Sequence, residues 1–199
     1  MAVLRSKKTE TNQVHSKTLF ENLNYQEKEA PGREFNECKF HKCNLYGTNF
    51  EGAVFHDCVF DGCDLSLIKV KHTSFVNVHI TNSKAIGIIW HEATNLFTLK
   101  FTHSILDFSS LYGKTLKKAI FTNCRAHEVD FSLCKLVEAD FQNTDLLNAV
   151  FRDCDISKAN FVDARNYNIS LQINTAKQAR FNLPEAISLF DSFGIVVEG

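Results

Sequence analysis

Nearly every fifth residue of the chain is apolar, and it is most often Phe or Leu. From Phe20 these positions follow one another in steps of five as far as Trp90. After a slip of one residue they resume at Leu96 and continue to Phe181. An α-helix has a period of 3.6 residues and a flat strand a period of 2, so neither explains a period of five. The repeat therefore predicts a short-period solenoid.

A second set of positions, two residues before each large apolar residue, holds small or β-branched side chains such as Cys38, Thr73 and Ala139. The repeating unit is thus small, polar, large, polar, polar. Two inward side chains in every five residues suit a narrow tube that turns a corner in each unit. Four units would make one coil of about 20 residues, and coils would stack at about 4.8 Å. Phe35 and Phe55 would then lie directly above one another.

Four segments fit this unit especially well: Cys43–Leu45, Ala139–Phe141, Ala149–Phe151 and Ala159–Phe161. With them the chain resembles the pentapeptide-repeat family over about residues 18–181. The resemblance implies an all-β fold, a right-handed quadrilateral β-helix, to which the tail adds a short C-terminal helix.

Two irregularities divide the chain, the register slip and the end of the repeat. The expected units are an N-terminal lead-in (1–17), a first β-helix segment (18–90), the slip (91–95), a second β-helix segment (96–181) and a C-terminal cap (182–199). Gly87, just before the slip, can relax the backbone there. Lys114 occupies a small inward position, where an unpaired ammonium is costly to bury. We therefore expect a local bulge or short loop near residues 110–115.

The tail predicts a helix near Asn182 to Phe190, a break at Gly194 and a short apolar strand at the end of the chain. An open solenoid end needs a cap, because it exposes core and strand edges. The many apolar residues favour burial against a second copy over a plain cap. The expected dimer interface comprises Leu183, Ile187, Leu189, Phe190, Phe193, Ile195 and Val197.

The end of the repeat and the tail resemble one particular group within this family. Phe161–Ile169, Ala179–Ala186 and Phe193–Val197 are similar to the C-terminal region of gyrase-protecting pentapeptide-repeat proteins. That group includes the Qnr quinolone-resistance proteins and the immunity proteins of albicidin and microcin producers. The resemblance implies a homodimer joined end to end, with DNA gyrase or topoisomerase IV as partner. It also implies DNA mimicry that protects the enzyme from poisons. The long projecting loops of some Qnr proteins are missing, which leaves quinolone protection open.

The net charge of −1 is small for a mimic of DNA, but acids are concentrated between residues 128 and 163. Only Lys135, Arg152 and Lys158 oppose them there. Residues 100–125 are predominantly basic. We interpret the acids as a partner-binding acidic face, against the alternative that they are ordinary solubilising residues of the repeat. The predicted face comprises Glu128, Asp130, Glu138, Asp140, Asp145, Asp153, Asp155 and Asp163.

The seven cysteines all occupy small inward positions, which predicts buried thiols rather than a zinc site or a disulfide framework. The eight histidines include no metal-spaced pair, and no nucleotide loop or nucleophile elbow occurs. We therefore expect no enzyme, no cofactor and no metal.

The chain lacks a membrane-length apolar run, a signal-peptide core, and a basic stripe with exposed aromatics. The expectation is a cytoplasmic protein without direct nucleic-acid or membrane binding. The alternative function is a pentapeptide-repeat scaffold with some other protein partner. A drug-modifying enzyme is a weaker third class.

Overall fold

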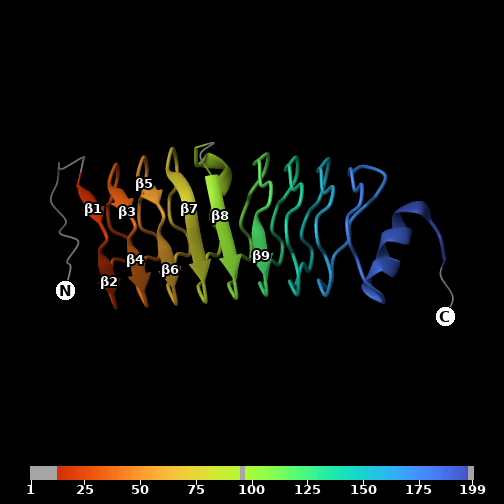
Figure 1. Ribbon diagram of the computed structural model, residues 1–199, viewed down its shortest axis with the longest axis horizontal. Coiled ribbons are helices and arrows are strands. Elements are labelled where there is room, and N and C mark those ends of the chain that lie inside the picture. The colour runs from red at the N-terminus through yellow and green to blue at the C-terminus, as the bar shows by residue number, and fades with distance from the viewer. Residues whose placement is uncertain (1–12, 95–96, 197–199) are drawn as a thin grey trace.

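The computed structural model describes residues 13–94 and 97–196, which form a parallel β-solenoid closed at one end by a helix (Figure 1). The predicted β-helix with a short C-terminal helix is therefore confirmed. Nine short strands form one sheet along the tube. The strands are β1 (Val14–Ser16), β2 (Leu19–Glu21), β3 (Glu34–Asn36), β4 (Lys39–His41), β5 (Val54–His56), β6 (Val59–Asp61), β7 (Ser74–Thr81), β8 (Phe97–Thr102) and β9 (Ile120–Thr122).

Each coil has four sides, because residues five apart belong to four separate parallel ladders. The pairs that show this are Ile120 with Asp140, Arg125 with Asp145, Asp130 with Val150, and Lys135 with Asp155. We name the sides by their inward residue in one coil: side A holds Phe121, side B Ala126, side C Phe131 and side D Leu136. A side consists of the inward residue, the residue before it and the two after it, the last of which lies at the corner.

Large side chains fill the tube by stacking on their counterparts one coil away. The ring centroids of Phe40 and Phe60 are 4.6 Å apart, and those of Phe121 and Phe141 are 4.9 Å apart, with nearly parallel planes. These spacings match the distance between hydrogen-bonded strands. The backbone ladder and the core thus have the same repeat distance.

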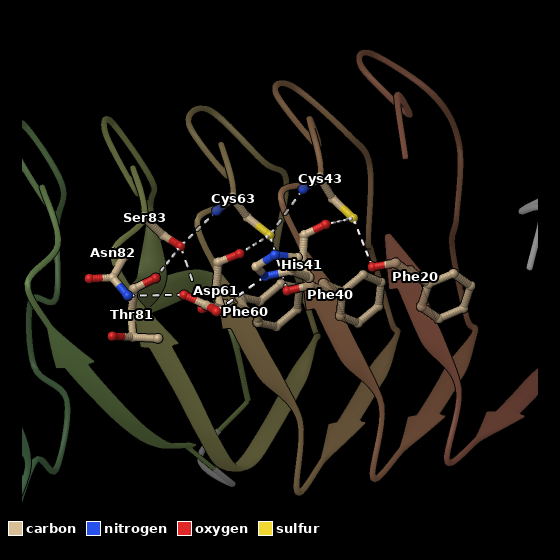
Figure 2. Close-up of polar contacts among 10 residues, drawn as sticks. All are labelled: Phe20, Phe40, His41, Cys43, Phe60, Asp61, Cys63, Thr81, Asn82 and Ser83. Atoms are coloured by element: carbon tan, nitrogen blue, oxygen red, sulfur yellow. Dashed lines mark hydrogen bonds and ion pairs between the residues drawn. The ribbon is translucent and has the colours of Figure 1, made fainter. Parts of the chain in front are cut away.

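Many of the small inward residues not only fit the narrow tube but also donate a hydrogen bond to the preceding coil. Cys58 Sγ donates to the carbonyl oxygen of Phe35 at 3.2 Å, and Cys134 Sγ to that of Leu111 at 3.0 Å. Thr73 makes the equivalent bond at 2.7 Å. Figure 2 shows one such column, in which Cys43 donates to the carbonyl oxygen of Phe20 and Cys63 to that of Phe40. The carbonyls of Leu111 and Phe50 also accept the backbone N–H of Lys114 and of Ala53, so the small residue supplies a second donor to a buried carbonyl.

All seven cysteines are buried and free, as the sequence predicts. Burial raises the pKa of Cys58, Cys124 and Cys134 to about 12. These three cysteines therefore remain neutral thiols and act as packing residues and hydrogen-bond donors rather than as nucleophiles.

The predicted slip is present as one extra residue between coils. Bridges before it join residues 20 apart, such as Asp64 and Lys84, whereas Lys84 pairs with Ile105, 21 residues on. The register of β7 against β8 shifts between Phe75 and Val78. The sheet nevertheless runs through the slip, so both repeat segments share one ladder. The expected restart at Leu96 lies outside the described residues.

The expectation of a local bulge or short loop near residues 110–115 was wrong. The five-residue corners continue without a break, and Lys114 is buried at the inward position between sides C and D. Its Nζ donates to the carbonyl oxygens of Ala93 and Thr94 at 2.5 and 3.0 Å. These carbonyls belong to the slip, so the ammonium bridges the irregular coil to the regular one. Burial lowers the pKa of this ammonium.

The repeat ends less regularly than the spacing predicts. Asn166, expected to point inward, is exposed, and the neighbouring Tyr167 is buried in its place. The cap is the 3-10 helix η2 (Glu185–Phe193), which ends at Gly194 with φ 65°. The expected strand is absent at Ile195–Val196, and its remainder lies outside the described residues.

We predict that Lys114→Met lowers the free energy of unfolding by about 1–3 kcal/mol, because it removes the donor for two carbonyls of the slip. Urea unfolding followed by circular dichroism measures the change. Lys117→Met is the matched control, since Lys117 is exposed in the same five-residue unit. Equal midpoints for both variants would mean that Lys114 does not hold the slip.

Candidate protein interface

The eight acids predicted to form one face are spread around the whole tube. Five-residue steps place successive acids on successive sides, so each side receives two of them. Side A holds Asp140 and Asp163, side B Glu128 and Asp145, side C Asp130 and Asp153, and side D Glu138 and Asp155. The acidic feature is therefore a belt around the tube, not a single face.

On side B, oppositely charged residues alternate along the tube. Arg125 pairs with Asp107, with Nη2 2.6 Å from Oδ2. One coil further on, Asp145 accepts a hydrogen bond from Arg165 Nε at 3.1 Å and lies 3.2 Å from His127 Nε2. Arg125 and Arg165 thus balance Asp107 and Asp145, so Asp145 contributes little free charge to the belt.

The surroundings of Asp145 determine its protonation. Burial alone would raise the pKa of this carboxyl group. Hydrogen bonds from Asn166, His127 and Arg165 outweigh burial, and the pKa is lowered below its ordinary value. Asp145 therefore stabilises the fold in its ionised form.

The cap exposes most of the residues predicted for the dimer interface. Leu183 is 73% exposed, and Ile187, Phe190, Phe193 and Ile195 are also exposed. Leu189 differs, because it is buried in the chain's own core and anchors η2 to the last coil. Val197 lies outside the described residues. The sequence thus located an apolar cap but did not separate its anchor from its outer face.

Sequence analysis missed a set of apolar residues on the outside of the tube. Between residues 60 and 180, every large apolar side chain described as exposed lies on side B, on side C or at one of their corners. These residues are Leu67, Ile89, Phe108, Tyr112, Leu133, Leu147, Val150 and Ile173. These residues could have been recognised in the sequence, because they are apolar residues at outward positions of the five-residue unit.

Concave features are shallow, because the core fills the tube. An open groove of about 370 Å³ is lined by residues that include Val150, Arg152, Asn168 and Ile173. Within the described ranges, no three His, Cys, Asp or Glu residues are grouped so as to hold a metal ion. In the same part of the chain, no helix is long and apolar enough to cross a membrane.

The comparisons with known proteins agree with this architecture. Residues 33–95 match the pentapeptide repeat region, and residues 134–165 match pentapeptide repeats in eight copies. The chain is a pentapeptide-repeat protein. Proteins of this kind are typically non-enzymatic scaffolds. The sequence comparison with curated proteins gives no match.

Two solved structures illustrate the likeness in fold. HetL, a pentapeptide repeat protein involved in heterocyst differentiation regulation from the cyanobacterium Nostoc sp. strain PCC 7120, has a TM-score of 0.70 at 18% identity. The match covers 84% of each chain. Full-length QnrB1, a plasmid-mediated fluoroquinolone resistance protein, has a TM-score of 0.54 at 16% identity, over 92% of this chain and 100% of that one. At these identities the likeness concerns the fold.

We predict that Asp145→Asn destabilises the protein by about 1–2 kcal/mol at pH 7, because it removes the carboxylate that pairs with Arg165 and accepts hydrogen bonds from Arg165 and Asn166. The folded-state pKa is depressed, so this contribution is present above about pH 4 and is lost as the pH falls through the lower folded value. Urea midpoints at pH 7 and pH 3 measure it, and the difference from wild type should shrink at pH 3. Asp153→Asn, at an exposed corner, is the control.

Proposed function

We propose that this pentapeptide-repeat protein is a cytoplasmic, non-enzymatic partner of bacterial DNA gyrase that protects the enzyme from topoisomerase poisons. Topoisomerase IV is the second candidate target. The proposed mechanism is DNA mimicry, in which the tube competes with DNA or destabilises the poisoned cleavage complex.

The acidic belt is the observation that carries this proposal. Its residues span fewer than two coils, which is about 10 Å of tube. Duplex DNA carries about one negative charge per 1.7 Å and presents it all around a cylinder. A belt on all four sides imitates that arrangement more closely than a single acidic face would. Local potential matters more for docking than the net charge of −1.

The likeness in fold to QnrB1 over that protein's whole length is consistent with the proposal. The likeness to HetL, whose described role is the regulation of differentiation, supports the alternative of a scaffold with another protein partner. Binding to purified gyrase discriminates between the two proposals.

A supercoiling assay with purified gyrase, with and without a quinolone and with albicidin, tests the function. We expect the protein to restore supercoiling in the presence of one of the poisons. Inhibition without rescue would support DNA-like binding but contradict protection. No effect in any reaction would favour the scaffold.

Neutralising the belt while keeping the fold tests the mechanism in the same assay. Asp130, Asp140 and Asp155 each accept a backbone N–H through Oδ1, which Asn also offers. A variant with Asn at Asp130, Asp140, Asp153, Asp155 and Asp163 and Gln at Glu138 should lose rescue. Full rescue by this variant would contradict DNA mimicry while leaving protection intact.

We further propose that two copies join through their C-terminal caps. Phe190 and Phe193 are exposed on η2, whereas Leu189 holds the helix to its own coil. Replacing both phenylalanines by Ser should therefore halve the mass measured by light scattering and leave the cap folded. Leu133→Asn, which changes an exposed apolar residue away from the cap, is the control. An unchanged mass in the double variant would mean that the helix only caps the tube.

A further inference from the structure

The corner between sides B and C carries an apolar ridge in the middle of the tube. The corner residues of three successive coils are Leu67, Gly87 and Phe108, joined by the backbone bonds of one ladder. A Cβ atom on residue 87 would lie only 2.7 Å from Leu67 Cδ2, so the leucine side chain lies across the glycine. Ile89 and Tyr112 are exposed beside this column on side C. We call Leu67, Ile89, Phe108 and Tyr112 the corner ridge.

The fold itself does not require an apolar corner. Phe108 is 60% exposed and has φ 60°, a conformation that is unfavourable for a large side chain. The same corner two coils further on holds Asn148 with φ 57°, and the corners after side A hold Asn82, Asn123 and Asn143, also with positive φ. Asparagine tolerates this conformation and hydrates well. Phenylalanine at this corner therefore costs stability without filling the core, which indicates a role in binding.

The shape of the ridge limits what can cover it. Leu67 and Phe108 lie two coils apart, about 10 Å along the tube, at the outermost point of a square cross-section. A second copy meeting this edge with its own edge would be convex against convex. Such a contact buries far less than the roughly 800 Å² per partner of a stable protein interface. A partner with a concave apolar cleft encloses the same edge from both sides.

The charges beside the ridge change sign along the tube. In the coils of Leu67 and Gly87, Lys69, Lys71 and Lys84 lie on sides B and C with Asp64 and Glu92, and Glu51 lies one coil before them. Toward the C-terminus, Arg125 and Arg165 are paired with Asp107 and Asp145, which leaves Glu128, Asp130 and Asp153 with Arg152. A complementary cleft is acidic at one end and basic at the other, which fixes the direction of the tube in it. Carboxylates at one end make the surface unsuited to a nucleic acid or an anionic membrane.

We propose that the corner ridge is the principal protein-contact site of this chain, and that it inserts into a concave apolar cleft of its partner with an acidic and a basic end. The proposal rests on the proposed function in one respect: the cleft belongs to gyrase. The ridge supplies affinity through desolvated apolar contact, whereas the acidic belt supplies long-range attraction.

The test measures the affinity of the full-length protein for intact purified gyrase by biolayer interferometry. Phe108→Asn and Leu67→Asn each place at a corner a residue that this fold accepts elsewhere. Leu133→Asn is the matched control, because Leu133 is also exposed and has φ 60°, but lies at the opposite edge of side C. Urea midpoints confirm that each variant is folded.

We expect each ridge variant to bind gyrase at least tenfold more weakly, and the control within twofold of wild type. The loss should persist at 0.5 M salt, where attraction between exposed charges is screened. Ridge variants that bind like wild type would overturn the ridge and leave the proposed function standing. Absence of binding by the wild-type protein would overturn the proposed function and with it the assignment of the cleft. A lower mass of Phe108→Asn in light scattering would identify a second copy as the occupant and contradict the proposal.

Discussion

The structure depends on the match between the hydrogen-bond spacing of parallel coils and the thickness of stacked side chains. Phe35 and Phe55 lie 4.8 Å apart between ring centroids, which is the distance that the backbone ladder imposes on successive coils. A polar group in the tube is tolerated where it supplies a donor to a carbonyl of the preceding coil. Inward residues such as Cys58 and Thr73 do so directly, and Lys114 does so at the slip. These inward positions leave the outward ones free to vary.

The period of five was sufficient to predict the tube, the buried cysteines and the slip, because each follows from which positions point inward. The period was insufficient to predict that Lys114 is buried without a bulge, because its acceptors are carbonyls of Ala93 and Thr94 in the preceding coil. No local pattern contains such a pairing. Tyr167 replaced Asn166 as the inward residue for a similar reason, since the last coil adapts to the cap. Local period thus predicts repetition, whereas irregular coils depend on contacts between them.

The acidic residues illustrate a different limit. Glu128 and Asp130 are neighbours in sequence, yet they lie on different sides because a corner separates them. Clustering along a chain therefore does not imply clustering on a surface when the chain turns every five residues. Counting acids by side, in steps of twenty, would have predicted the belt from the sequence once four-sided coils were accepted. The same count would have revealed the outward apolar residues of sides B and C.

The belt and the corner ridge complement each other physically. Exposed charges act over roughly a Debye length of 8 Å at physiological ionic strength, so they guide encounter but are replaced by water and salt at little cost. An exposed Phe108 has no long-range effect, but once enclosed it must be rehydrated before the complex can separate. The belt should thus govern association and the ridge dissociation. One continuous ladder fixes the positions of the belt and the corner ridge along the tube. Phe108 therefore lies one coil from Glu128, and a rigid partner can engage the two together.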